Sequence, residues 1–394
     1  MPLPAFEPAK TNSTTRTFRL SGLMAKKVLW NLDDHTRAKH RILRAYLDAW
    51  IPVMGRTAKG RSRTGSPRLL LVDGFAGPGR YATGEDGSPL IMLKALLEHA
   101  DFNNLSSVEF IYLFIESSKA RVDHLKTELD AIETPANVTC HVEKGTFEDK
   151  FGEIVDEIHQ EDSSLIPTFA FVDPFGYSFT PMSLAGKFLD FPRCEALFFL
   201  PMVDILRFVS RDRQDDAMNS LFGTDRWRDA IKMQGEERRT FLLSLFEDQL
   251  REGGRVDYVR SFEIRTEKGR EYRLVFASEH EKGLALMKRA MWSVDPSEGV
   301  KYVAARGRDG QEVLFTADAV DTAPLLDHLR EKFGTDWFTI EAAERTTLVD
   351  TNFLHDGHLK SKTLSPARKA DLIEVENPPG RRGFAPGTKI RFVS

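Results

Sequence analysis

The sequence is poor in cysteine and lacks any long hydrophobic run. Its 394 residues include 2 cysteines, too few for a disulfide framework or a thiolate metal site. Cys140 and Cys194 both lie in apolar, strand-like segments, which favours buried reduced thiols. No apolar run approaches the ~18 residues that a membrane span needs, and residues 1–10 carry no apolar core of a secretory signal. We therefore expect a cytoplasmic protein with no membrane segment.

Several catalytic signatures are also missing. The chain contains no G-x-x-x-x-G-K-[ST] phosphate loop, no H-E-x-x-H zinc motif and no G-x-S-x-G nucleophile turn. Its 10 histidines are scattered, and the pair His355 and His358, with no cysteine nearby, is more typical of a solvated helix face than of a metal site. His40, on an otherwise apolar helix, is more typical of a buried core histidine than of a base. We predict no metal ligands.

Charge is distributed unevenly along the chain, although the net charge is only -4. Residues 1–70 carry 14 Lys and Arg against 4 Asp and Glu, and residues 355–394 carry 8 against 4. The intervening 284 residues have a net charge of -18. Basic ends on an acidic body indicate a protein that touches a polyanion through its termini. The alternative is a basic tail that remains solvated.

Short apolar segments alternate with amphipathic ones through the first half of the chain. We predict strands over 69–73, 108–116, 138–142, 168–173 and 196–201, separated by helices over 89–100 (with Ser88 as N-cap), 118–132, 147–161 and 180–188. Fully apolar strands between helices predict a parallel sheet covered on both faces. Helices over 214–231 and 236–252, a hairpin over 258–277 and a helix over 282–292 follow. The outline is α/β, a doubly wound, Rossmann-like sheet of the class I methyltransferase type.

Three regions complete the predicted organisation. Residues 1–34 form a basic, loosely ordered N-terminal arm, and residues 35–317 form the Rossmann-like domain. This domain opens with a helix over 35–50 that ends at Pro52, followed by a mobile basic loop over 55–67. Residues 318–394 form a separate winged helix-turn-helix domain, with helices over 322–333, 340–347 and 357–370 and strands over 372–376 and 389–393.

A glycine-rich loop follows the first predicted strand. Its sequence is Asp73-Gly74-Phe75-Ala76-Gly77-Pro78-Gly79, and glycines here allow a tight turn and close approach of a ligand. Gly77-x-Gly79-x-x-Ala82 fits a dinucleotide fingerprint loosely, but no helix begins at Ala82 to receive a pyrophosphate. The match is to D-x-F-x-G-x-G, which is frequent in nucleic-acid methyltransferases and predicts S-adenosylmethionine as the cofactor. A purely structural glycine turn is the alternative.

Two further strand ends could contribute to the same site. Glu116 ends the second strand, where an acid suits the two hydroxyls of a ribose; a solvated strand end is the alternative. Gly145-Thr146-Phe147 follows the third strand, where such folds place residues against an adenine. We therefore predict cofactor contacts from Asp73, Gly74, Phe75, Gly77, Gly79, Glu116, Thr146 and Phe147.

Asp173-Pro174-Phe175-Gly176 follows the fourth predicted strand. It is similar to the D/N-P-P-Y/F motif of enzymes that methylate exocyclic amino groups, and it looks like the version found in tRNA guanine-N2 dimethyltransferases. There the acid and the following carbonyl accept hydrogen bonds from the amine, and the ring stacks on the base, which contributes about 1–3 kcal/mol. We predict Asp173, Pro174 and Phe175 as the catalytic residues; the alternative is that Asp173 only caps the next turn.

With these motifs in view, the chain resembles the three-Cys-motif partner (TcmP) family. The matching residues are Lys39-His40-x-x-Leu43-x-x-Tyr46-Leu47-x-x-Trp50, the loop from Asp73 through Tyr81, Gly87-Ser88-Pro89-Leu90, Asp173-Pro174-Phe175-Gly176 and Met287-Lys288-x-x-Met291-Trp292. They run through most of residues 35–300, and the tail looks like the family's C-terminal winged helix. The resemblance implies a bacterial protein with a three-cysteine-motif, radical-SAM-like iron–sulfur partner.

The combined motifs predict an S-adenosylmethionine-dependent methyltransferase that acts on an exocyclic amino group of a nucleic acid, RNA or DNA. Phosphates would be bound by basic residues of the tail, namely Lys360, Lys362, Arg368, Lys369, Arg381 and Arg382. The resemblance also allows a non-catalytic or co-catalytic subunit that presents nucleic acid to the iron–sulfur partner. A small-molecule methyltransferase with a regulatory winged helix is a third interpretation.

Overall fold

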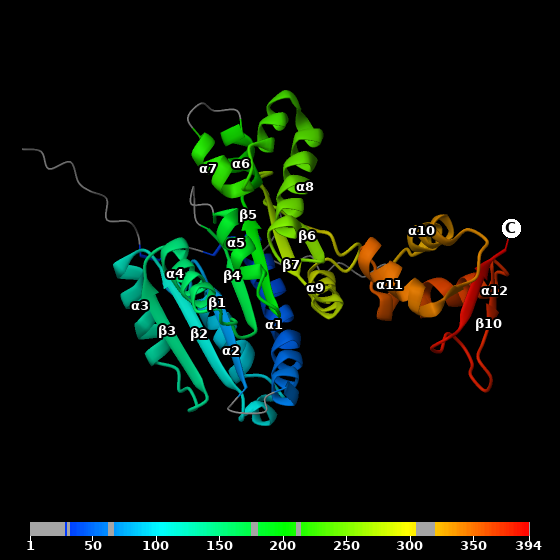
Figure 1. Cartoon of the computed structure of the whole chain (residues 1–394), viewed down its shortest axis with the longest axis horizontal. Helices are drawn as coiled ribbons and strands as arrows, with labels where there is room; N and C mark the ends of the chain where they lie inside the picture. Colours follow the sequence, from blue (N-terminus) through cyan, green and yellow to red (C-terminus); the bar gives the residue numbers. More distant parts are fainter. Residues whose placement is uncertain are drawn as a thin grey trace, which may run out of the picture.

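The structure is a computed structural model that describes residues 28–29, 32–61, 67–174, 180–209, 214–304 and 320–393. In this part of the chain the main body is built on an eight-stranded sheet of order β3-β2-β1-β4-β5-β7-β6-β8 (Figure 1). The strands are β1 (Arg68–Asp73), β2 (Glu109–Glu116), β3 (Val138–Lys144), β4 (Thr168–Val172), β5 (Cys194–Leu200), β6 (Tyr258–Arg265), β7 (Glu271–Ser278) and β8 (Lys301–Val303).

Strands β1 to β5 run parallel, and β7 is antiparallel to both β5 and β6. This order, with the antiparallel β7 inserted between β5 and β6, is that of a Rossmann-like class I methyltransferase sheet, which confirms the predicted fold class. The carboxyl ends of β1, β2, β4, β5 and β6 therefore lie at one edge of the sheet, together with the start of β7. Ligands of doubly wound sheets bind at this edge.

Helices cover both faces of the sheet, each over its own apolar cluster. The first face carries α1 (Asp34–Arg61), α2 (Ser88–Leu97), α3 (Lys119–Asp130) and α9 (Glu281–Val294), with the short η1 (Phe102–Leu105) beside α1. The second face carries α4 (Phe147–Gln160), α5 (Met182–Leu189), α6 (Met202–Val209), α7 (Asp215–Phe222), η2 (Arg226–Lys232) and α8 (Gly235–Gly253). Both faces of the central strands are buried, as their unbroken apolar sequences predict.

Helix α1 is longer than its sequence predicts. It continues through Pro52 to Arg61, so the predicted helix end at Pro52 and the predicted loop over 55–61 are wrong; residues 62–66 lie outside the described residues. A proline inside a helix removes one backbone hydrogen bond, but tertiary packing outweighs that loss because Ile51 is fully buried. Gly55 also packs so closely that a Cβ there would lie 2.7 Å from Leu105.

A buried carboxylate fixes α1 to the sheet. Glu195, on β5, accepts hydrogen bonds from the Tyr46 hydroxyl (2.6 Å), the Trp50 indole N–H (2.5 Å) and the Ser278 hydroxyl (2.6 Å). Burial raises the pKa of Glu195, while these three donors lower it. Because Tyr46 and Trp50 lie on the inner face of α1, the network sets the rotation and height of that helix on the sheet.

Smaller differences have local causes. The N-cap of α2 is Gly87, not the predicted Ser88, which is the first helical residue. The helix predicted over 214–231 divides at Gly223, whose φ of 66° is left-handed and ends α7. Helix α6 and strand β8 were not predicted, because α6 directly continues an apolar strand and β8 has three residues. The hairpin β6–β7 is confirmed.

The C-terminal unit contains α10 (Ala323–Phe333), α11 (Ile340–Asp350), the π-helical segment η3 (His355–Leu364) and α12 (Ser365–Lys369). Its sheet has the order β10-β11-β9, with β9 (Phe338–Thr339), β10 (Ile373–Glu376) and β11 (Lys389–Phe392). The predicted helix over 357–370 is thus a π-helix followed by a short α-helix, and β9 was not predicted. The winged-helix interpretation stays a prediction, as does the boundary at 317/318, which lies outside the described residues.

Two basic side chains of the main body cap the C-terminal end of α11. Lys288 Nζ, on α9, donates to the backbone carbonyls of Thr347, Leu348 and Thr351, each at 2.9 Å. The Arg260 guanidinium, on β6, donates to the Thr351 carbonyl at 3.0 Å. Burial and the nearby Arg260 lower the pKa of Lys288 to about 6, so the contact rests on hydrogen bonding more than on charge. The last carbonyls of a helix have no partner within the helix, so these two side chains satisfy them and fix the C-terminal unit to the main body (Figure 1).

We expect the substitution Lys288→Met to release the C-terminal unit. Three carbonyls, those of Thr347 and Leu348 buried and that of Thr351 partly buried, would lose a hydrogen-bond donor, at a cost of about 3 kcal/mol. Limited proteolysis should then cleave between the two units much faster than in the wild type, with each fragment remaining folded. Lys282→Met, an exposed lysine on the same helix, is the matched control and should leave cleavage unchanged. Equal cleavage rates for the two variants would contradict this role of Lys288.

Both cysteines are free thiols. Burial raises the pKa of Cys140 to about 11 and that of Cys194 to about 12, so both are protonated at neutral pH, as expected for unreactive thiols. Among the helices that the structure describes, none is long and apolar enough to cross a membrane.

Candidate functional site

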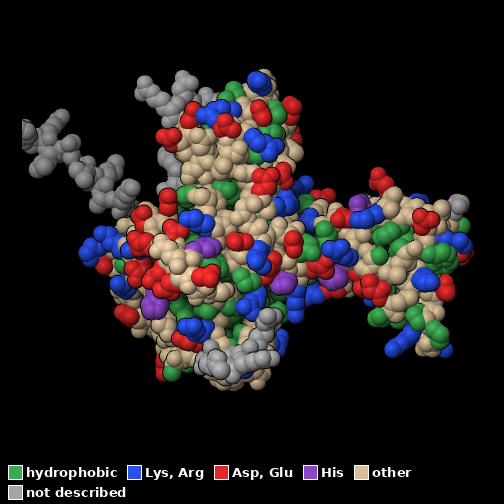
Figure 2. Space-filling model, viewed as in Figure 1, with side chains coloured by type: hydrophobic (Ala, Val, Ile, Leu, Met, Phe, Trp, Pro, Cys, Tyr) green, Lys and Arg blue, Asp and Glu red, His purple; other side chains and the backbone are tan. Residues whose placement is uncertain are grey.

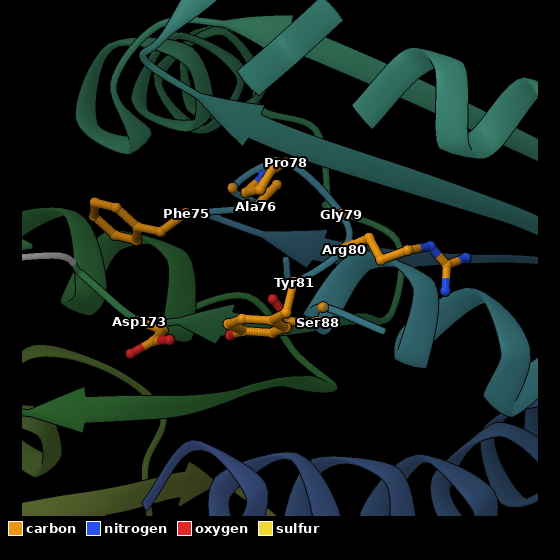
Figure 3. A pocket seen from close by; sticks show the side chains of 10 residues that line it. Phe75, Ala76, Pro78, Gly79, Arg80, Tyr81, Ser88 and Asp173 are labelled. Atoms are coloured by element: carbon orange, nitrogen blue, oxygen red, sulfur yellow. The ribbon is translucent and has the colours of Figure 1, made fainter. Parts of the chain in front are cut away.

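The loops after β1 and β4 meet in one pocket at the carboxyl edge of the sheet. Asp73, at the end of β1, pairs in register with Phe171 of β4, two residues before Asp173. The pocket is lined by the loop from Phe75 through Tyr81, by Gly87 and Ser88, and by Asp173 (Figure 3). The two motifs that the sequence singled out, 100 residues apart, therefore face a common space.

The glycine loop requires glycine at two positions. Gly77 and Gly79 have φ values of 65° and 84°, a left-handed conformation that other residues adopt at a cost. A Cβ at Gly79 would lie 2.7 Å from Leu125 of α3, so the loop also lies too close to that helix for a side chain. The Gly79 carbonyl accepts from the Gly87 N–H at 2.7 Å, which connects the loop to the start of α2.

Asp73 is fully buried beneath this loop. Its pKa is raised to about 7, mainly by burial and also by the nearby Asp173, although the Ser88 hydroxyl, the Phe75 N–H and Lys39 act to lower it. The Phe75 N–H donates to Asp73 Oδ1 at 3.1 Å. Asp73 does not line the pocket itself, but a buried carboxyl group that titrates near neutrality responds to charges that come close to it.

Glu116 binds the glycine loop from the next strand. Its Oε2 accepts from the Gly77 N–H at 3.1 Å, and its Oε1 accepts from the Ser118 N–H at 2.6 Å. Arg121 Nη2 lies 3.0 Å from the same Oε1. Both carboxylate oxygens are thus engaged within the protein, so a ribose diol would share or displace these donors. The predicted contact of Glu116 with a ribose stays a prediction.

The residues after β3 have structural partners. Thr146 caps α4, its hydroxyl accepting from the Asp149 N–H at 3.1 Å. Phe147 is buried, and a Cβ on Gly74 would lie 2.5 Å from its ring, so Gly74 is glycine because Phe147 packs against it. Phe75, 6.1 Å from Phe147 between ring centroids, lines the pocket. Cofactor contacts from Thr146 and Phe147 stay predictions.

Asp173 forms a buried ion pair with Lys39 of α1, the side chains being 7% and 4% exposed. The Lys39 ammonium also lies 4.4 Å from the centre of the Phe199 ring, close enough for a cation–π contact. Lys39 was not predicted as a site residue. Its spacing to Leu43 places both on the inner face of α1, and a buried lysine on such a face needs an acidic partner, which is the signal that could have found it.

The rest of the predicted catalytic motif is only partly described. Pro174 is buried, whereas Phe175 lies outside the described residues. The Tyr81 ring extends from the glycine loop across the pocket on the side of Asp173 (Figure 3), 5.9 Å from His40 between ring centroids. His40 is buried and its pKa lies well below the usual value because of that burial and of nearby Lys39, so its imidazole is neutral. The free volume left in the pocket is about 10 Å³.

The six predicted phosphate-binding residues lie on the C-terminal unit. Lys360 pairs with Glu344 at 2.7 Å. The other five are exposed, and no ion pair is found for them among the described residues: Lys362 on η3, Arg368 and Lys369 on α12, and Arg381 and Arg382 between β10 and β11. Figure 2 shows Lys and Arg side chains at the projecting tip of this unit. None of the six predicted residues lines the pocket at Asp173. Their contact with phosphate stays a prediction.

No protein-family model and no curated protein matches the chain. Solved structures similar to it include Trm1 from Pyrococcus horikoshii with S-adenosyl-L-methionine, at 12% identity and a TM-score of 0.37 over 94% of this chain and 93% of that one. An O-methyltransferase from Bacillus cereus in complex with SAH gives 11% identity and a TM-score of 0.30 over 60% and 80%. The chain spans 40% of the length of a candidate methyltransferase from Porphyromonas gingivalis W83, at 13% identity and a TM-score of 0.25 over 58% of this chain. These likenesses are too distant to identify a reaction, and the fold assignment rests on the strand order itself.

We expect Asp73 to make stability depend on pH. Its pKa is about 7 in the folded state and 3.8 when unperturbed, so between these values the folded protein holds a proton that the unfolded chain has lost. As a result, the free energy of unfolding is highest below pH ~4. It falls by up to about 4 kcal/mol as the pH rises to ~7, and it then stays constant. Asp73→Asn removes this dependence.

The measurement is urea unfolding of both proteins at a series of pH values, followed by circular dichroism. The stability of Asp73→Asn relative to the wild type should increase from pH 4 to pH 7 and stay constant above pH 8. Titrating groups that do not interact with Asp73 cancel in the difference. A difference that does not vary with pH would contradict the raised pKa of Asp73.

Proposed function

We propose that the protein is an S-adenosylmethionine-dependent methyltransferase that acts on an exocyclic amino group of a nucleic acid. The observation that carries the proposal is the shared pocket: the glycine loop after β1 and Asp173 after β4 face each other at the carboxyl edge of a class I methyltransferase sheet. Asp173 lines this pocket, and Asp73, also buried, directly precedes the glycine loop. An acid at Asp173 can accept hydrogen bonds from an amine, and one at Asp73 favours a nearby cation.

The donor set fits S-adenosylmethionine, whereas the present free volume does not. The cofactor carries an amino group and a sulfonium, and Asp73, with its pKa of about 7, ionises readily when a cation approaches. A free volume of about 10 Å³ holds no more than one water molecule. Because the Tyr81 ring occupies the pocket (Figure 3), we expect this side chain to move when the cofactor binds.

In this reaction the cofactor supplies an electrophilic methyl group. Asp173 accepts hydrogen bonds from the target amino group, and the Pro174 carbonyl is the second acceptor in the motif. These contacts orient the nitrogen lone pair and favour the positive charge that develops on nitrogen as the methyl is transferred. The Asp173 carboxylate would then accept the proton that the methylated nitrogen releases. Without substrate, Lys39 forms an ion pair with the Asp173 carboxylate. When the amine binds, the carboxylate interacts with both Lys39 and the amine. The glycine loop and Glu116 hold the donor side of the pocket.

The nucleic-acid substrate is supported by the charge distribution. Five exposed basic residues of the C-terminal unit have no ion-pair partner among the described residues, and this unit is fixed to the main body through Lys288 and Arg260. Phosphates attract such residues regardless of sequence. A C-terminal winged helix, as the resemblance to the TcmP family implies, would deliver a bound strand toward the sheet edge.

We expect Asp173→Asn to reduce methyl transfer by about 100-fold or more, because an amide no longer supplies a charged acceptor for the amine. The assay is transfer of tritiated methyl from S-adenosylmethionine to unmodified RNA and, separately, to DNA. Binding of the cofactor, measured by calorimetry, should change by less than about tenfold. Asp190→Asn, an exposed aspartate after α5 that lies 3.6 Å from Arg255, is the control and should retain full transfer.

Absence of S-adenosylmethionine binding to the wild type, with or without nucleic acid, would overturn the proposal. So would full methyl transfer by Asp173→Asn.

Two observations favour a second function, that of a subunit without its own catalysis. Asp173 is already paired with Lys39, and the pocket has little free volume. In that case the chain presents nucleic acid to a three-cysteine-motif iron–sulfur partner. Asp173→Ala would then retain full biological activity in the host, whereas removal of the C-terminal unit would abolish it. Methyl transfer by the isolated wild-type chain would exclude this function.

A further inference from the structure

A second cavity lies at the same edge of the sheet, beyond the turn of the β6–β7 hairpin. Its volume is about 220 Å³. The lining residues used below are His35 and Asp33 from the start of α1, Glu267, Lys268 and Arg270 from the hairpin turn, and Tyr272 from β7. None of them belongs to the pocket at Asp173 or to the predicted site residues.

The sheet places this cavity beside Asp173. β7 is the second neighbour of β4 in the strand order, after β5, and neighbouring strands are about 4.8 Å apart. The register places Val172, at the end of β4, level with Val275 of β7. Tyr272 is therefore about 10 Å to the side and about 10 Å further along the strand direction. A few nucleotides of an extended single strand span such a distance, so one polynucleotide can reach both places.

A column of stacked aromatic rings connects the two places. The His35 and Tyr272 rings are parallel within 6° at 4.8 Å, and Tyr272 and Phe199 stack at 4.9 Å and 17°. Phe199 in turn contacts the Lys39 ammonium that pairs with Asp173. Stacked rings that end in a cavity present the kind of planar surface that single-stranded nucleic-acid sites use for a base.

We propose that this cavity binds a nucleotide of the substrate strand a short distance along the strand from the one that is methylated. The proposal rests on the proposed function and names a separate subsite for it. The base extends the column of rings at His35 and Tyr272, and the phosphate lies against Lys268 and Arg270 at the rim.

The charges of the cavity fit both parts of a nucleotide. Lys268 and Arg270 are exposed, and no ion pair is found for them among the described residues. The carboxylates of Asp33 and Glu267 repel phosphate but accept hydrogen bonds from the amino groups of a base. A volume of about 220 Å³ is below the ~300–1,000 Å³ of drug-sized pockets, which suits one ring system rather than a whole cofactor.

The test compares His35→Ala with His35→Phe in the full-length chain. Binding of a short mixed-sequence single-stranded RNA, and of the DNA of the same sequence, is measured by fluorescence anisotropy. We expect His35→Ala to weaken binding by about tenfold and His35→Phe to retain it, because phenylalanine restores the planar surface. Cofactor affinity and thermal stability should be unchanged in both variants.

A second pair of variants tests the binding of phosphate. Lys268→Ala combined with Arg270→Ala should make the salt dependence of RNA binding less steep, by about 0.7 in the logarithmic slope for each phosphate that the variant no longer binds. Lys282→Ala combined with Arg255→Ala removes two exposed cations at the opposite edge of the sheet and should leave the slope unchanged.

Wild-type binding of cofactor and RNA, with equal RNA affinity in all His35 variants and an unchanged slope for the hairpin pair, would overturn the subsite and leave the proposed function standing. A wild type that binds no cofactor would instead overturn the proposed function. Loss of RNA binding in His35→Ala and His35→Phe alike, with both variants folded, would also overturn the stacking role.

Discussion

The buried ion pair between Lys39 and Asp173 is the contact on which the site depends. A lysine on the inner face of a helix is costly to bury unless an acid neutralises it, and Asp173 is placed to do so because β4 ends directly below α1. The same pairing keeps a carboxylate buried at the sheet edge. Each buried charge is neutralised by the other, so the packing of the first helix and the chemistry at the end of the fourth strand are coupled.

The Glu195 network makes that arrangement possible. Glu195 binds the hydroxyl of Tyr46 and the indole of Trp50, residues that follow Lys39 at helical spacing on α1. Once these two side chains are fixed, the rotation of α1 is fixed, and Lys39 is directed toward Asp173. A structural network on one side of β5 thus positions a charged group at the proposed active site. It also explains why α1 continues through Pro52: the packing that holds it persists on both sides of the proline.

The carboxyl edge of the sheet gathers chemically distinct groups from strands far apart in sequence. Asp73 contributes a carboxyl group that titrates near pH 7, the glycine loop contributes close backbone approach, and Asp173 contributes a hydrogen-bond acceptor. Beyond β5, the hairpin adds two cations and Tyr272, which stacks between His35 of α1 and Phe199 of β5. Because Lys288 and Arg260 fix the C-terminal unit to α9 and β6, its basic surface has a defined place relative to this edge.

The sequence by itself determined the fold class and the strand that carries each motif, because apolar runs, helical spacing and glycine turns are local properties. It did not determine how long α1 is, since a proline ends a helix only where packing does not compensate. Nor could it pair Lys39 with Asp173, join Phe199 to Tyr272 and His35, or show that Phe147 lies under Gly74. Those contacts join residues brought together by the order of strands in the sheet, and burial, not spacing along the chain, decides which charges and rings meet there.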